Sequence, residues 1–164
     1  MMFGLTSLGI IHTAISLVAV FAGAISLIKL KEITWNNSLG KTYVIATILT
    51  CLTGFGIFQH GGFGKPHVLG IITLAVLGVI YFAQKANQPL GKYSPYIEKV
   101  AYSLTFFFHL VPGVTETTTR LPLEHPWANS PDDPLVAQLV GICLILFLVG
   151  VTFQIIALRK KLSQ

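Results

Sequence analysis

The chain has 164 residues, of which 53% are hydrophobic and only 10% are charged, and its formal net charge is +5. Soluble domains carry about 25% charged residues, and disordered chains combine low hydrophobicity with high charge. The composition therefore argues against both classes and predicts an integral membrane protein. The basic residues do not form the aromatic-interleaved patch that single-stranded nucleic acid needs, so we expect no nucleic-acid partner.

The first three predicted helices are apolar stretches long enough to cross a bilayer, which takes about 20 residues. They cover residues 3–28, 42–59 and 67–83. The first contains His12, the second is followed by His60, and the third opens at His67. A tight turn with three glycines separates the second helix from the third, so His60 and His67 are expected to face each other across it.

The fourth predicted helix covers residues 100–119 and has two interpretations, which differ at Pro112. Proline usually kinks or ends a helix, although membrane helices tolerate it when neighbours satisfy the freed carbonyl. If the helix continues, His109, Glu116 and Arg120 share one face, because residues three or four apart are neighbours on a helix. If it ends at Pro112, Glu116 and Arg120 are loop residues.

The last predicted elements are an outer proline-rich loop, residues 121–134, and a fifth helix, residues 135–158. Four prolines prevent the loop from being a regular helix throughout, and we expect it to cap the outer face. No ten-residue segment alternates with period two, as a membrane barrel requires. The predicted fold is therefore all-α: a single bundle, residues 1–164, of five transmembrane helices.

The connections between the predicted helices carry an unequal share of the basic residues. Nine of the eleven lie in the first and third connections or after the last helix: Lys29, Lys31, Lys41, Lys85, Lys92, Lys99, Arg159, Lys160 and Lys161. Only Lys65 and Arg120 lie on the opposite side. Positive residues stay cytoplasmic, so the pattern predicts an outside N-terminus and an inside C-terminus.

All five histidines fall in the outer half or outside under this orientation: His12, His60, His67, His109 and His125. Ionisable groups within a bilayer are costly and are functional candidates. We predict a metal site near the outer leaflet whose candidate ligands are His12, His60, His67, His109 and Glu116. Several histidines with one carboxylate suit zinc, copper or iron, whereas His12 and His109 facing each other would suit the axial positions of a b-type haem. The alternative is that each histidine only bonds a neighbouring helix.

Part of the chain resembles a family of uncharacterised bacterial multi-pass membrane proteins that is defined as a domain of unknown function. The resemblance covers residues 12–78, with an early histidine, the turn Leu39-Gly40-Lys41-Thr42-Tyr43 and the run Leu52-Thr53-Gly54. The stretch 115–122 also resembles a signature of small bacterial membrane proteins. Residues 36–38 depart from the family, in which a histidine often stands there. The resemblance implies a bacterial inner-membrane location and no established activity.

Three functional hypotheses follow from these features. The first is a metal or haem site that serves electron transfer, metal handling or oxidation of a lipid-soluble substrate such as a quinone. The second is a non-catalytic subunit or scaffold within a homo-oligomer or a larger membrane complex. The third is a metal-dependent membrane hydrolase, which needs an open coordination position and a path for water. The lipid bilayer is the one partner common to all three, and no catalytic residue can be named.

Overall fold

The computed structural model of the chain describes residues 6–58, 62–85, 87 and 89–164, and within them every regular element is helical. Five long helices follow one another: α1 (Ser7–Ile25), α2 (Ser38–Gly54), α3 (Lys65–Ala83), α4 (Ser94–Arg120) and α5 (Pro134–Leu162). A π-helix, η1 (Ser26–Leu30), extends α1, and a short 3-10 helix, η2 (Gly91–Tyr93), precedes α4. The all-helical prediction is confirmed.

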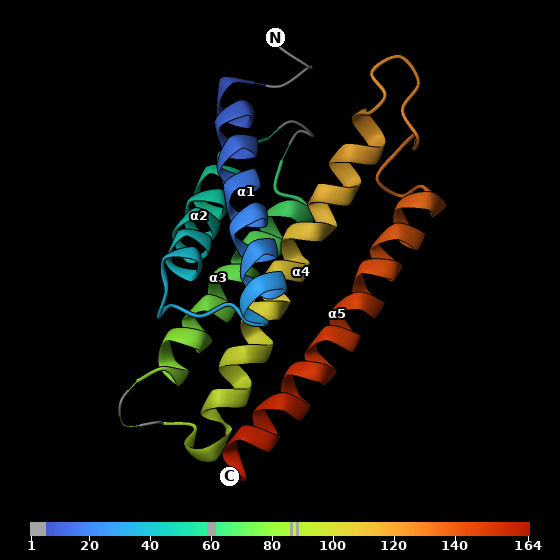
Figure 1. Cartoon of the computed structure of the whole chain (residues 1–164). Coiled ribbons are helices and arrows are strands. Elements are labelled where there is room, and N and C mark those ends of the chain that lie inside the picture. The colour runs from blue at the N-terminus through green and yellow to red at the C-terminus, as the bar shows by residue number, and fades with distance from the viewer. Residues whose placement is uncertain (1–5, 59–61, 86, 88) are drawn as a thin grey trace.

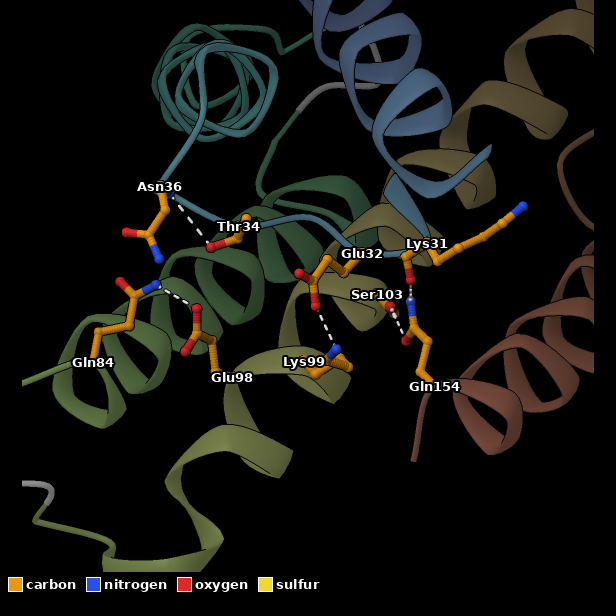
Figure 2. A network of polar contacts seen from close by, with 9 residues as sticks. All are labelled: Lys31, Glu32, Thr34, Asn36, Gln84, Glu98, Lys99, Ser103 and Gln154. Carbon is orange, nitrogen blue, oxygen red and sulfur yellow. Dashed lines mark hydrogen bonds and ion pairs between the residues drawn. The ribbon is translucent and has the colours of Figure 1, made fainter. Parts of the chain in front are cut away.

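Consecutive helices run in opposite directions, and each packs against the next one along the chain (Figure 1). The first and third connections therefore meet at one end of the bundle, where Lys99 pairs with Glu32 and Gln84 donates a 2.7 Å hydrogen bond to Glu98 (Figure 2). We call this the basic end, because the nine basic residues of the connections and the C-terminus lie there. We call the opposite end the acidic end, because it holds Glu116, Glu124, Asp132 and Asp133, and there Lys65 pairs with Asp132 at 2.9 Å.

The bounds of α2 differ from the predicted 42–59. The helix begins at Ser38 because the side chain of Asn37 caps it, accepting a 2.8 Å hydrogen bond from the Gly40 amide. It ends at Gly54, short of the predicted end, in a segment where two glycines, Gly54 and Gly56, weaken helix formation. The whole element is thus displaced by about one turn toward the N-terminus.

Helix α4 continues through Pro112 to Arg120, so the continuous helix is the interpretation that the structure supports. Pro112 lacks the amide that would bond the carbonyl four residues earlier, yet the helix resumes beyond it. His109 and Glu116 consequently lie on one element, about two turns apart. Residues 121–133 contain no helix, as their prolines predict.

The bundle is held together by small and aromatic side chains where α1, α2 and α4 meet. Ala19 and Tyr43 are fully buried, and Gly23 lies between α2 and α4. A Cβ atom at Gly23 would stand 2.6 Å from a ring carbon of Phe106 and 2.9 Å from one of Tyr43. Only glycine permits this approach, which is a common means of helix association in membranes.

Within the described residues, three helices are long and apolar enough to cross a membrane: Ser7–Leu30, Lys65–Ala83 and Pro134–Leu162, with mean hydropathies of 2.1, 2.0 and 2.7. Much of their apolar surface is uncovered, as large exposed side chains on α1, α3 and α5 such as Phe21, Ile71 and Leu146 show. Soluble monomers rarely expose such extended apolar surface, whereas lipid covers it without cost. These features are those of a helical membrane protein.

Candidate functional site

A row of polar side chains runs through the interface of α1, α2 and α4. We call it the polar seam, and its members are His12, Ser16, Tyr43, Thr47, Thr50, Thr53, Thr105 and His109. On α2 the seam residues Tyr43, Thr47 and Thr50 recur at helical spacing, so they face the same neighbours. Three members of the seam are completely buried: Tyr43 and Thr47 on α2, and Thr105 on α4. A polar row at the centre of an otherwise apolar bundle is the strongest candidate for a functional site.

His12 lies on α1 about one and a half turns from the acidic end, and its imidazole rests against α2. A Cβ atom at Gly54 would be only 3.2 Å from Cε1 of the ring, so the absence of a side chain at Gly54 makes room for the imidazole. The Nδ1 atom of His12 is 3.0 Å from the hydroxyl oxygen of Thr53. The position of the ring is thus set by α2 and not by α1 alone.

The direction of this hydrogen bond follows from the other contacts of Thr53. Its hydroxyl oxygen is 2.8 Å from the carbonyl oxygen of Leu49 and 3.1 Å from that of Thr50, both of which only accept hydrogen bonds. A hydroxyl has one hydrogen, and a threonine inside a helix commonly donates it to the carbonyl four residues earlier. With its own hydrogen on a carbonyl, Thr53 accepts from His12, an arrangement that favours the tautomer with the ring hydrogen on Nδ1. The imidazole also makes a hydrogen bond to the backbone of Thr50.

His109 is arranged in the same way from the other side of α2. It is buried, with 8% of its surface exposed, and its Nε2 atom is 3.0 Å from the hydroxyl oxygen of Thr47. Thr47 donates its own hydrogen to the carbonyl oxygen of Tyr43 at 2.7 Å. This arrangement favours the tautomer of His109 with the ring hydrogen on Nε2 and the lone pair on Nδ1.

The tyrosine of the seam supports His109. The hydroxyl of Thr105 donates to the carbonyl oxygen of Tyr102 at 2.8 Å, so it accepts the hydrogen of Tyr43, whose oxygen is 2.8 Å away. The ring of Tyr43 meets the imidazole of His109 edge-on, with 5.9 Å between ring centres. Tyr43 thus fixes the spacing of α2 and α4 beside the histidine.

Charge links the two histidines with each other and with one carboxylate. His12 and His109 are close enough for a positive charge on one to oppose a positive charge on the other. Glu116, two turns beyond His109 on α4, attracts charge on His12 and pairs with Arg120. The structure therefore places His12 within electrostatic range of both His109 and Glu116.

His67 is used differently, because it holds the start of its own helix. Its Nδ1 atom accepts a 3.2 Å hydrogen bond from the Gly64 amide, which leaves the ring hydrogen on Nε2, a buried atom with no hydrogen-bond partner among the described residues. Phe58 and Phe63 lie against the imidazole, with ring centres 5.1 and 5.2 Å away. In this arrangement His67 presents no free lone pair to a metal. The predicted ligand His60 lies outside the described residues.

A complete metal-ligand set is not assembled in the described part of the chain, where no group of three or more histidine, cysteine, aspartate or glutamate side chains is placed to hold a metal ion. The metal centre with five ligands therefore stays a prediction. The threonines that orient the histidines were not anticipated from the sequence. The helical spacing of Tyr43, Thr47 and Thr50 on α2 is the sequence signal that could have revealed a polar face there.

Comparisons with known proteins return no relative: no protein-family model matches the chain, and no match is found among curated proteins or solved structures.

Proposed function

We propose that this chain is a multi-pass inner-membrane protein that binds a transition-metal ion or a b-type haem through His12 and His109, and that it serves redox chemistry or metal handling. The observation that carries the proposal is the pair of oriented imidazoles. Metal-ligating histidines typically donate their other ring N–H to a fixed acceptor, which sets the tautomer and raises ligand basicity. Thr53 and Thr47 would play that part for His12 and His109, since their hydroxyl oxygens lie 3.0 Å from the ring nitrogens.

Two properties of the pair bear on which group it binds. Two protein donors suffice for a haem, since the porphyrin supplies the remaining nitrogen ligands, and the described residues offer no third histidine, cysteine or carboxylate in a ligand group. The favoured lone pair of His109, however, is on Nδ1, the ring nitrogen nearer to the backbone. A bare metal ion can reach this nitrogen more easily than a haem iron can. A bound haem or copper ion would supply one-electron chemistry near the outer leaflet.

The membrane topology that accompanies this proposal has five spans. If α1 and α3 both cross from the acidic end to the basic end, the chain must return between them through α2, and α4 must likewise return it to the start of α5. Helix α2, with 17 residues, is about 26 Å long at 1.5 Å per residue, close to the thickness of a hydrocarbon core. The basic end is then cytoplasmic, and the histidine pair lies in the outer half.

The test is the composition of the protein purified from its native membrane. Metal analysis and an optical absorption spectrum are expected to show about one haem, or one copper, iron or zinc ion, per chain. A haem with two axial histidines gives a low-spin spectrum that a bare metal ion does not give. Protein that carries neither metal nor haem, and takes up neither when supplied with each, would overturn the proposal.

A second candidate function, a subunit of a larger membrane assembly, is supported by α5. This helix packs along α4, while large apolar side chains such as Ile145, Leu146 and Phe153 are more than 60% exposed. A partner helix would cover the same face that lipid covers. Protein extracted in a mild detergent and found entirely as a monomer would count against an assembly, whatever its metal content.

A further inference from the structure

A groove separates η1 from the basic-end half of α5, and α4 lies between the two. Its volume is about 670 Å³, within the range of roughly 300–1,000 Å³ that is usual for small-molecule sites. Leu27, Phe107 and Phe147 contribute to its apolar walls. Neither His12 nor His109 lines the groove, so it is distinct from the polar seam.

The basic-end part of the groove is polar, and most of its polar groups are already paired. Gln154 of α5 donates a 2.9 Å hydrogen bond to the carbonyl oxygen of Lys31 and accepts a 2.8 Å hydrogen bond from Ser103 of α4 (Figure 2). Lys99 pairs with Glu32. These contacts connect the three helices and neutralise one of the three lysines that line the groove.

The other two lysines give this part of the groove its net positive charge. Lys31 and Lys161 both line it, from the end of η1 and the end of α5, and both side chains are exposed. Lys31 donates one hydrogen to the carbonyl oxygen of Ile28 at 2.8 Å, and an ammonium group has two more to offer. Glu32, the one acidic residue of the lining, is occupied by Lys99.

We propose that this groove binds one anionic phospholipid from the leaflet at the basic end, with an acyl chain against the apolar walls and the phosphate between Lys31 and Lys161. The walls are formed by helices whose apolar surface faces outward, so a lipid chain can enter sideways from the bilayer. Basic pockets between membrane helices on the cytoplasmic side characteristically hold anionic headgroups. The proposal does not depend on the function of the histidine pair.

Binding is tested with the full chain in non-ionic detergent, titrated with phosphatidylglycerol, with phosphatidylcholine of the same acyl chains, or with inorganic phosphate, while bound lipid is counted by native mass spectrometry. We expect one phosphatidylglycerol per chain, at least tenfold tighter than phosphatidylcholine. The double variant Lys31→Gln/Lys161→Gln is expected to lose at least tenfold in affinity. The matched control Lys41→Gln/Lys160→Gln removes two charges at the same end outside the groove and is expected to retain it.

The acyl-chain part of the proposal is tested separately with Gly150→Leu. Gly150 lines the groove, and a Cβ atom there meets nothing within 4 Å, so the leucine fills the groove without disturbing the fold. The control Gly141→Leu lies elsewhere on α5, where the added side chain also starts in open space. Loss of phosphatidylglycerol binding in Gly150→Leu alone supports the proposal.

Three results would overturn it: equal affinity for the two lipids, equal loss in the paired charge variants, or lipid binding that Gly150→Leu leaves unchanged. Competition by inorganic phosphate alone at the same concentration as lipid would show an anion site without a lipid. If the lipid-free chain is found as a dimer and Gly150→Leu dissociates it, the groove would be assigned to a second copy of the chain.

Discussion

The hydroxyl oxygens of Thr47 and Thr53 lie 2.7 and 2.8 Å from carbonyl oxygens of their own helix, and donation to those carbonyls favours one tautomer for each of two histidines on other helices. A threonine inside a helix commonly bonds the carbonyl four residues earlier. Once that hydrogen is committed, the oxygen can only accept. The orientation of His12 and His109 therefore depends on threonines, which carry no charge and are inconspicuous within an apolar run.

Replacing Thr47 with valine tests this control of the tautomer. The variant keeps the shape of the side chain and removes the acceptor of His109 Nε2–H, which is expected to cost about 1 kcal/mol of stability. Loss of an orienting partner lowers metal affinity about 10–100-fold. Thr47→Ser retains the hydroxyl and is expected to behave like the wild type. Both effects are measured in detergent, by denaturant unfolding and by metal or haem titration; equal affinities in the valine and serine variants would refute the assigned role.

The sequence alone draws attention to His12 and His109, because an ionisable group within an apolar stretch is conspicuous. It was not sufficient to separate them from His67. That residue also borders an apolar helix, but it bonds the amide of Gly64 three residues earlier. A contact of this kind depends on local backbone geometry at a helix start, which histidine spacing does not encode.

At the scale of elements, the close packing of α1 on α2 and α4 depends on Gly23. Gly23→Ala is expected to destabilise the bundle by about 1–3 kcal/mol, the usual cost of overpacking, because the new methyl group would overlap the rings of Phe106 and Tyr43. Gly78→Ala on α3 adds the same methyl group in open space and is expected to be neutral or to stabilise its helix by about 0.5–1 kcal/mol. The free energy of unfolding of each variant is compared; the same loss in both would contradict this packing.

Helix type and order were predictable from apolar length, but the exact bounds depended on caps and glycines. Asn37 displaces the start of α2 toward the N-terminus, and Gly54 marks its end and makes room for His12. Pro112 left two interpretations of α4 open, because its effect depends on neighbouring helices. Helix α4 packs against both α3 and α5. These contacts exist only in the assembled bundle, so the local sequence around Pro112 does not encode them.

At the scale of the whole molecule, the separation of charge predicts which end faces the cytoplasm. In a background with Cys51→Ala and Cys143→Ala, a membrane-impermeant maleimide is expected to label Lys65→Cys from outside intact cells. Lys92→Cys, at the basic end, is expected to react only after the membrane is opened. Labelling of both positions from the same side would contradict the five-span topology.

The central claim is that His12 and His109, on separate helices, hold one metal or haem together. The most direct measurement is the metal and haem content per chain of His12→Gln, His109→Gln and His67→Gln, each purified alongside the wild type and checked for a folded, monodisperse state. We expect either of the first two substitutions to lower the content at least tenfold, and His67→Gln to match the wild type. Equal contents in all four proteins, or a loss caused by His67→Gln alone, would contradict the account.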